Sequence, residues 1–179
     1  EKYKHAKEGV SLTTDRGFTV HAKKLVFATG YETPNYIKKK VVRLKSTYAI
    51  VTEPVPDFVG WGFDQSLIWE TARPYLYLRT TADGRIMVGG EDEDFVNPAK
   101  RDKLIPLKAN LLLRKLRKLF PRMELEIAYS WAGTFGETED SLPYIGEVPE
   151  FPNAYFALCY GANGTNFALL GAELIRDMY

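Results

Sequence analysis

The residues with the clearest capacity for chemistry lie near the C-terminus, where the apolar run Tyr155–Cys159 leads into a loop containing Gly161 and Gly164. A helical pattern then extends from Thr165 to Met178. The first turn of a helix has unpaired backbone N–H groups and a partial positive charge, and glycine lets a ligand approach the backbone closely. Such an arrangement suits a phosphate, a carboxylate or the anionic edge of a cofactor ring. It is explained equally well as an ordinary strand-to-helix turn.

Two further stretches end in loops that could face a ligand. The apolar run Lys24–Ala28 stops at Thr29 and Gly30, as a buried strand does at the carboxyl edge of a sheet. In the second stretch we expect a strand to end near Trp131, followed by a long polar loop and a Pro-Tyr-Ile-Gly sequence that ends at Gly146. The residue types alone make neither stretch a site.

The remaining reactive side chains carry little weight. His5 and His21 are too isolated to suggest a general base or a metal pair. Cys159 is best explained as a small residue buried in a strand. The acidic run Glu91–Asp94 could bind a metal ion, but a solvated loop is the better explanation, so we expect no metal site.

Short strands must position these loops. Alternating or apolar runs, bounded by turn residues such as Asp83-Gly84, predict strands and two hairpins. The predicted strands are Val10–Thr13, Phe18–Ala22, Lys24–Ala28, Tyr48–Thr52, Leu67–Glu70, Tyr75–Thr80, Arg85–Gly89, Ile127–Trp131 and Tyr155–Cys159.

Two stretches show the periodicity of amphipathic helices. The first helix is predicted to begin near Pro106, because proline fits the first turn, and the second to cover Thr165–Met178. The apolar stripe of the first comprises Ile105, Ala109, Leu112, Leu116 and Leu119, and that of the second comprises Phe167, Leu170, Leu174 and Met178.

These elements predict an α+β (mixed α/β) fold. Segments 1–42 and 136–179 resemble pieces of a Rossmann-like domain, whereas segment 43–135 is expected to form an inserted antiparallel-sheet domain with one amphipathic helix. The net charge of +1 gives no overall attraction to nucleic acid, and no apolar run is long enough for a membrane span. One cysteine among 179 residues fits a reducing, cytoplasmic environment. The start at Glu1 without Met is interpreted as a cut end.

The order and spacing of these motifs resemble the D-amino-acid-oxidase (glycine-oxidase-like) family of FAD-dependent oxidoreductases over residues 20–179. The resemblance covers the Val-Phe-Ala-Thr-Gly strand, the sheet domain, Trp-Ala-Gly, Asp-Ser-Leu-Pro-Tyr-Ile-Gly and Tyr-Gly-Ala-Asn-Gly-Thr. It implies that FAD lies against three groups of residues. They are Ala28, Thr29 and Gly30; Asp140, Pro143 and Gly146; and Gly161, Ala162, Asn163, Gly164 and Thr165.

The resemblance also implies oxidation of the C–N bond of an amine or amino acid, with no catalytic residue identified. Relatives hold the dinucleotide with a G-x-G-x-x-G loop, which this chain lacks, so we expect the chain alone to bind FAD weakly and to be inactive. Phe135 stands where many relatives have an arginine for the substrate carboxylate. Arginines of the sheet domain could replace it, and tyrosines could line the cavity. The candidates are Arg43, Arg73, Arg79, Tyr48 and Tyr77.

Other functions stay open. A non-catalytic module that binds a small molecule or a partner explains the same sheet domain. The basic face of the first helix could contact an anionic membrane, although a solvated face is the better explanation; its residues are Arg114, Lys115, Arg117 and Lys118. We also expect self-association of the chain through exposed apolar surface around Leu25–Ala28 and Phe156–Leu158.

Overall fold

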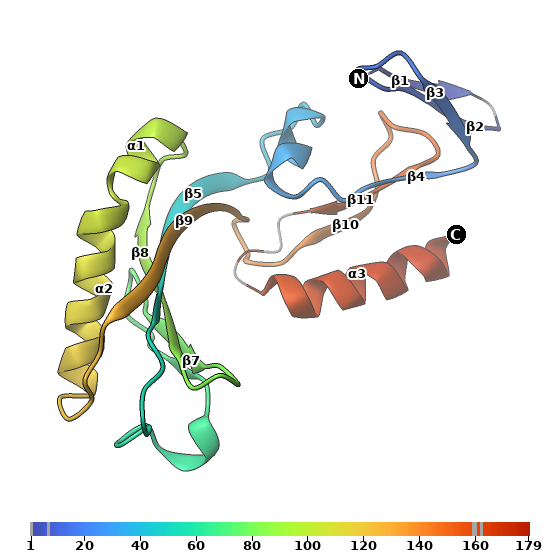
Figure 1. The fold of residues 1–179 in the computed structure, drawn as a ribbon. Coiled ribbons are helices and arrows are strands. Elements are labelled where there is room, and N and C mark those ends of the chain that lie inside the picture. Colours follow the sequence, from blue (N-terminus) through green and yellow to red (C-terminus); the bar gives the residue numbers. More distant parts are fainter. Residues whose placement is uncertain (1, 7, 159–160, 162) are drawn as a thin grey trace. The chain divides into compact units, whose positions relative to one another are not determined.

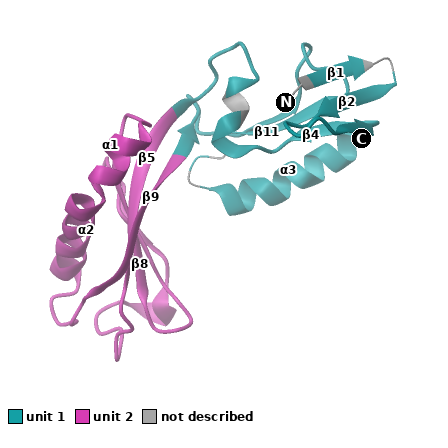
Figure 2. Ribbon diagram, turned by 45° about the horizontal axis from the view of Figure 1, so that its top comes forward, with its two compact units in different colours: residues 1–43, 135–179 teal, residues 44–134 magenta. Residues whose placement is uncertain are grey.

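The computed structural model describes residues 2–6, 8–158, 161 and 163–179. They form two compact units: unit 1 comprises residues 1–43 and 135–179, and unit 2 comprises residues 44–134 (Figure 2). Each boundary lies one residue from the expected one. The expected mixed fold with antiparallel sheets is confirmed. The assignment of one unit to the cofactor and the other to the substrate stays a prediction.

The N-terminal strands of unit 1 form an antiparallel sheet of order β1-β2-β3. The strands are β1 (Lys2–Ala6), β2 (Gly9–Thr13) and β3 (Thr19–Ala22). β2 and β3 are the expected hairpin, in which the Gly17 N–H donates to the Thr14 carbonyl at 3.0 Å. β1 is not predicted by the sequence pattern, because its lysines and histidine interrupt the apolar alternation that marks a strand.

The second sheet of unit 1 is mixed and has the strand order β10-β11-β4 (Figure 1). Its strands are β10 (Tyr144–Glu147), β11 (Ala154–Leu158) and β4 (Leu25–Phe27). β11 runs antiparallel to β10 and parallel to β4. Every residue of β11 is buried, which explains its continuous apolar sequence.

Aromatic rings fill the core of unit 1. Phe27 and Phe156 stack with centroids 4.6 Å apart, and Phe151 packs against Phe156 edge-on at 5.3 Å. The Tyr3 hydroxyl donates to the Pro152 carbonyl at 2.7 Å and so joins β1 to this core. The expected exposure of residues 156–158 is wrong, since each of these side chains is buried.

Helix α3 (Gly164–Met178) packs on β10 and β11. The expectation that its apolar stripe is buried is wrong for Leu170, Leu174 and Met178, which are 45%, 41% and 44% exposed. Gly171 is buried instead. Periodicity identifies an apolar stripe, but it does not say what covers the stripe. A short 3-10 helix, η1 (Gly30–Asn35), follows β4.

Unit 2 is built on a sheet of order β6-β7-β8-β5-β9. Its strands are β5 (Arg43–Thr52), β6 (Ile68–Trp69), β7 (Tyr77–Thr80), β8 (Ile86–Glu93) and β9 (Ile127–Glu137). β5 and β9 extend beyond unit 2 at their outer ends. β9 continues six residues beyond the predicted end at Trp131, so the expected polar loop is a strand up to Glu137.

Helix α2 (Ile105–Leu119) covers one face of this sheet (Figure 1). Ala109, Leu112 and Leu116 of the predicted stripe are buried in its core, whereas Leu119 is exposed. Two smaller helices, η2 (Phe63–Gln65) and α1 (Pro98–Lys103), are not predicted by the sequence pattern, because they are shorter than its period can resolve. In the part of the chain that the structure describes, no helix is both long enough and apolar enough to cross a membrane.

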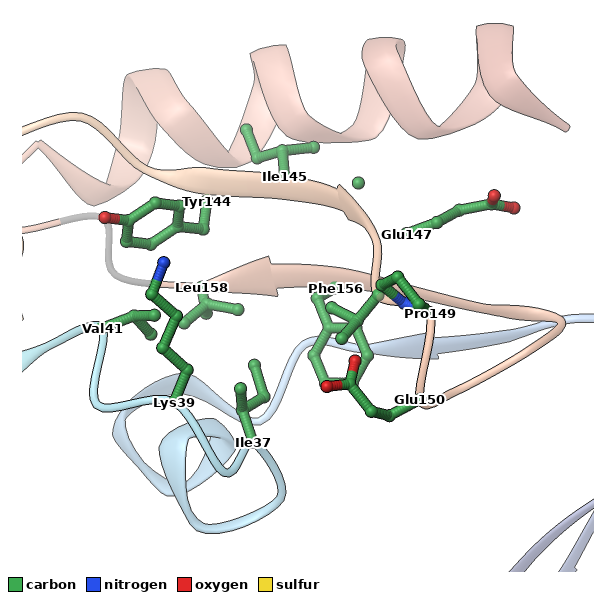
Figure 3. Close-up of a pocket in the computed structure, with 12 residues that line it drawn as sticks. Ile37, Lys39, Val41, Tyr144, Ile145, Glu147, Pro149, Glu150, Phe156 and Leu158 are labelled. Atoms are coloured by element: carbon green, nitrogen blue, oxygen red, sulfur yellow. The ribbon is translucent and has the colours of Figure 1, made fainter.

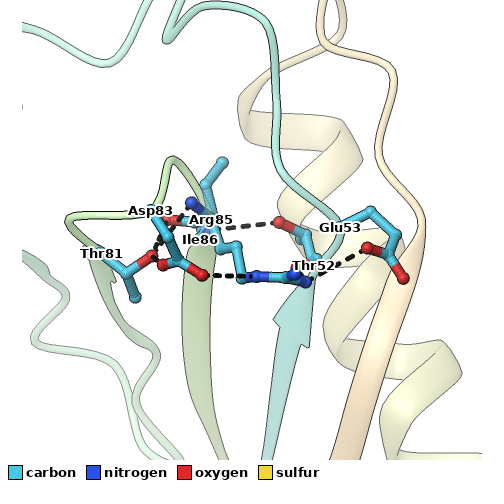
Figure 4. A network of polar contacts seen from close by, with 6 residues as sticks. All are labelled: Thr52, Glu53, Thr81, Asp83, Arg85 and Ile86. Carbon is cyan, nitrogen blue, oxygen red and sulfur yellow. Dashed lines mark hydrogen bonds and ion pairs between the residues drawn. The ribbon is translucent and has the colours of Figure 1, made fainter.

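A polar network closes the predicted β7–β8 hairpin (Figure 4). Arg85 donates from Nε to Asp83 at 2.8 Å, and from Nη1 to the Thr52 carbonyl at 3.0 Å and to Glu53 at 3.2 Å. Thr52 Oγ1 accepts from the Ile86 N–H at 3.0 Å. These bonds tie the turn to the end of β5.

Candidate functional site

The parallel pairing of β4 with β11 brings two of the predicted loops to the same edge of a sheet. Phe27 lies opposite Phe156, so both strands end at this edge. The loop Ala28–Gly30 follows β4, and α3 begins at Gly164 shortly after β11 ends. Ala162 of the predicted site lies outside the described residues, as does Cys159. The carboxyl edge of parallel strands is where α/β folds bind ligands.

The backbone at this edge leaves room for a ligand. Gly30 and Gly161 have φ values of 59° and 57°, a conformation that favours glycine. A Cβ added at Gly30, Gly161 or Gly164 would meet no atom of the described residues within 4 Å. The Gly161 N–H donates to the Gly136 carbonyl at 3.2 Å, which fixes the loop against the end of β9.

The start of α3 offers backbone donors. Asn163, the N-cap residue, makes no side-chain capping bond within the described structure. Its carbonyl accepts from the Phe167 N–H at 3.1 Å, so the helix is regular from its first turn. Thr165 is exposed. This helix end has the partial positive charge that suits an anion or the anionic edge of a ring.

The predicted segment between Asp140 and Gly146 divides into a turn and a strand. Asp140 accepts from the Leu142 N–H at 3.0 Å, and Thr138 donates to the Leu142 carbonyl at 2.8 Å. Pro143 directly precedes β10. Gly146 pairs with Phe156 inside the sheet, so it lies further from the edge than the glycines of the loops. The sequence pattern does not predict β10, because its sequence Tyr-Ile-Gly-Glu shows neither alternation nor a continuous apolar run.

A cavity of about 320 Å³ lies between the segment after η1 and the β10–β11 hairpin of unit 1 (Figure 3). Its walls are largely apolar, and charged groups stand around it. Figure 3 shows Lys39 near Tyr144, and Glu150 beside Pro149. The lining residues are Ile37, Lys39, Val41, Tyr144, Ile145, Gly146, Glu147, Val148, Pro149, Glu150, Phe156 and Leu158.

The two tyrosines expected to line a substrate cavity lie on opposite faces of the unit 2 sheet. Tyr48 is 1% exposed and faces α2, with Lys108 Nζ 5.4 Å from its ring centroid. Burial raises the pKa of Tyr48, and its hydroxyl has no hydrogen-bond partner among the described residues. Tyr77 alternates with the buried Leu78, so it points to the other face. Tyr48 is therefore a core residue, which corrects the expectation.

The face of the sheet opposite α2 carries Tyr77 in a fixed position. The phenol of Tyr77 lies over Gly89 of the paired strand, where any Cβ would clash with it. Burial raises the pKa of the Tyr77 hydroxyl; a hydrogen bond with Thr47 opposes this effect, and the charge of Asp92 adds to it. Tyr77 thus stays a neutral phenol well above neutral pH.

An aromatic row continues from Tyr77. The ring centroids of Tyr77 and Tyr75 are 6.0 Å apart, and those of Tyr75 and Trp69 are 6.1 Å apart. The Arg73 guanidinium lies 5.0 Å from the Tyr75 ring centroid. Arg79 is exposed and donates to the Thr80 carbonyl at 3.3 Å. Arg73 thus stacks on a ring of the aromatic row.

Arg43, the third arginine considered for the substrate carboxylate, and Phe135, which stands where relatives have an arginine, belong to unit 1. Arg43 is the first residue of β5 and is exposed. Phe135 is a half-buried residue of β9.

Ion pairs on the helix face of unit 2 were not anticipated by the sequence pattern, which favours a solvated loop for the acidic run. Lys108 is 7% exposed, and its Nζ lies 2.6 Å from Glu93 and 3.7 Å from Glu91. Lys115 lies 2.6 Å from Glu91. The helical spacing of the lysines, seven residues apart, is the signal that could have revealed their common face. The expectation of a solvated loop is wrong, because Glu91 and Glu93 belong to β8 and pair with α2.

The sequence of this chain is similar to those of known proteins. The family profile described as FAD dependent oxidoreductase matches residues 1–178. A glycine oxidase of Bacillus licheniformis is 30% identical over 120 residues, covering 66% of this chain and 31% of that protein. A glycine oxidase of Geobacillus kaustophilus is 28% identical over 109 residues, covering 60% of this chain and 28% of that protein.

Solved structures share the fold. The L-proline dehydrogenase of P. horikoshii superposes with a TM-score of 0.70 at 21% identity, covering 98% of this chain and 48% of that one. The iminodiacetate oxidase of Chelativorans sp. BNC1 gives a TM-score of 0.71 at 14% identity, covering 96% and 46%. The matches thus span about a third of the curated relatives and less than half of these structures.

Proposed function

The chain belongs to the family of FAD-dependent oxidoreductases, and from this premise we propose that it forms part of an enzyme that oxidises the C–N bond of an amine or amino acid. The observation that carries the proposal is the parallel register of β4 and β11, which brings the Ala28–Gly30 loop and the start of α3 to one edge. The names of the relatives support the reaction class, since glycine oxidases and an L-proline dehydrogenase act on C–N bonds.

The residues at this edge fit the cofactor that the family uses. FAD would lie against the backbone of Gly30, Gly161 and Gly164, where added Cβ atoms would project into open space. Thr29, Asn163 and Thr165 complete this edge, and Asp140 holds the adjoining turn. When bound, FAD accepts the hydride that leaves the substrate carbon.

The chain's own contribution is preorganised backbone. The unpaired N–H groups at the start of α3 would stabilise negative charge on a bound flavin ring, and because the helix is regular from its first turn they would need no rearrangement to do so. The bond from Gly161 to Gly136 keeps the preceding loop in place. The oxidised amine must be neutral to donate a hydride, and solvent can take its proton, since no base is identified.

For an amino-acid substrate, the arginine stacked on Tyr75 is the candidate partner of the carboxylate. Arg73 takes the role that relatives give to an arginine at the position of Phe135. Arginine binds a carboxylate through two parallel bonds, which orients it as well as attracts it.

Flavin reduction tests the proposed reaction. The full-length gene product should show a flavin absorption spectrum that bleaches on anaerobic addition of one member of a panel of amines and amino acids. A colourless protein that takes up no added FAD would favour the alternative, a non-catalytic module that binds a small molecule.

The second test concerns the 179-residue chain alone. We expect it to bind FAD weakly and to lack activity, because it contains no G-x-G-x-x-G loop for the pyrophosphate. Titration of FAD fluorescence with the chain measures this directly. Tight binding, in the nanomolar range typical of a complete site, would contradict the expectation.

A further inference from the structure

We propose that the cavity of unit 1 binds a small monocarboxylate with an apolar body, and that Lys39 pairs with its carboxylate. The inference goes beyond the proposed function and does not depend on it, because the cavity lies on the face of the mixed sheet that points away from α3.

The strand β11 decides which face carries the cavity. Tyr155 reaches α3, where its hydroxyl donates to the Met178 carbonyl at 3.0 Å. Successive side chains of a strand point to opposite faces, so Phe156 and Leu158 lie on separate positions of the face away from α3. Both of these buried side chains line the cavity (Figure 3).

The paired strand β10 supplies the room. Gly146 lies opposite Phe156, and a Cβ added to it would meet no atom of the described residues within 4 Å. Its φ of 146° disfavours any residue with a side chain, so the space beside it stays open. The resulting volume of about 320 Å³ is within the range of pockets that bind small molecules.

The segment after η1 forms the opposite wall. Ile37 and Val41 line the cavity and pack against the core cluster that contains Phe156 and Leu158. An apolar ligand body would therefore lie against the rim of a packed core and lose its contact with water, which is favourable in proportion to the apolar area buried.

Lys39 adds a positive charge to this apolar wall. Figure 3 shows its side chain extended from the segment after η1 toward Tyr144 of β10. Among the described residues, no carboxylate forms an ion pair with Lys39, so its ammonium group is available to a ligand. A charge-assisted hydrogen bond from an ammonium group to a carboxylate is stronger than one between neutral groups.

Two carboxylates limit the ligand to a single negative charge. Glu150 lies beside Pro149, away from Lys39, and Glu147 also borders the cavity (Figure 3). A second carboxylate on the ligand would be repelled by these groups. The ligand class is therefore a monocarboxylate whose remaining atoms are apolar.

Binding of hexanoate to the 179-residue chain tests the site without flavin. We expect hexanoate to shift the amide NMR signals of Gly146 and Phe156 in a saturable way. The neutral n-hexanol and the dicarboxylate adipate, which have the same number of carbon atoms, should bind more weakly. Lys39→Gln should weaken hexanoate binding about fivefold, the size expected for a charge contact that is open to solvent on one side.

The neighbouring Lys40 provides the matched control. Lys40 is exposed and does not line the cavity, so Lys40→Gln should leave hexanoate binding unchanged. Lys39 is exposed as well, so its replacement does not disturb the core. Lys39→Glu, which puts a negative charge at the same point, should abolish hexanoate binding.

Two outcomes in the 179-residue chain would overturn the inference: equal affinities for hexanoate and n-hexanol, or undiminished hexanoate binding in Lys39→Gln. The same loss in Lys39→Gln is expected in the FAD-loaded full-length protein, and its absence there would show that the cavity is not a site in the whole protein. None of these measurements reports flavin reduction, so a failure here leaves the proposed C–N oxidation standing.

Discussion

At the scale of single residues, Lys108 stands out in unit 2 because it is a charged side chain that is buried. It is 7% exposed and faces Glu91, Glu93 and the ring of Tyr48. A buried lysine is tolerated when carboxylates compensate its charge, and removing the lysine leaves those carboxylates uncompensated.

Lys108→Met should therefore destabilise the chain by about 2 kcal/mol, measured by urea denaturation. The cost stays below that of a fully buried pair, because Lys115 still neutralises Glu91 and the Glu93 side chain is 37% exposed. Lys118→Met, on the exposed side of the same helix, is the control and should change stability by less than about 0.5 kcal/mol. Similar losses in both variants would show that the ion pairs do not hold α2 to β8.

At the scale of elements, the β7–β8 hairpin links stability to pH. Hydrogen bonds from Thr81 and Arg85 lower the pKa of the Asp83 carboxyl below its ordinary value of 3.8. Because the folded chain has the lower pKa, the stabilisation is complete above pH 3.8 and is lost as the pH falls through the folded-state pKa. Asp83→Asn should thus reduce the denaturation midpoint at pH 7 and have no effect at the acid end of the range. An equal decrease of the midpoint at both ends of the pH range would show that the charge of Asp83 does not stabilise the hairpin.

The apolar stripes of the two long helices differ in how much they contribute to the free energy of unfolding. Leu112 of α2 is fully buried, and Leu112→Ala should cost about 2–5 kcal/mol of unfolding free energy. Leu170 of α3 is 45% exposed, and Leu170→Ala should cost less than about 1 kcal/mol in the same chain. Thermal and urea denaturation of both variants measures the contrast. A large loss for Leu170→Ala would mean that α3 is covered in solution.

Periodicity predicted the elements well and their surroundings poorly. The alternation of β2 and β3 and the stripe of α2 are local signals, so the strands, hairpins and helix follow from them. β10 shows neither alternation nor a continuous apolar run, and its pairing with β11 decides its structure. Burial depends on what packs against a residue, so the pattern predicts neither that Tyr48 is a core residue rather than part of a cavity wall nor that the α3 stripe is exposed.

At the scale of the whole molecule, the edge of the mixed sheet offers a surface on which a second copy of the chain can pair. β4 ends the strand order of this sheet in the described part of the chain, and Val26 is 46% exposed. Unpaired strand edges and apolar surface favour pairing with a second copy. We propose that the chain self-associates, with an apparent mass above 20.4 kDa in light scattering at micromolar concentration. Val26→Lys should shift the population toward monomer, because a charge on an edge strand opposes pairing; a monodisperse monomer in the unmodified chain would refute the idea.

The path of the chain has a different consequence. Unit 2 is one continuous segment, and it is entered along β5 and left along β9, which are neighbours in the same sheet. A Cβ added at Gly133, near one crossing point, would lie 3.9 Å from the side chain of Thr47, near the other. The whole segment, with its strands and loops, can therefore be replaced by a segment of another protein, in evolution or by design. Because the two junctions are adjacent, such a replacement preserves the rest of the chain.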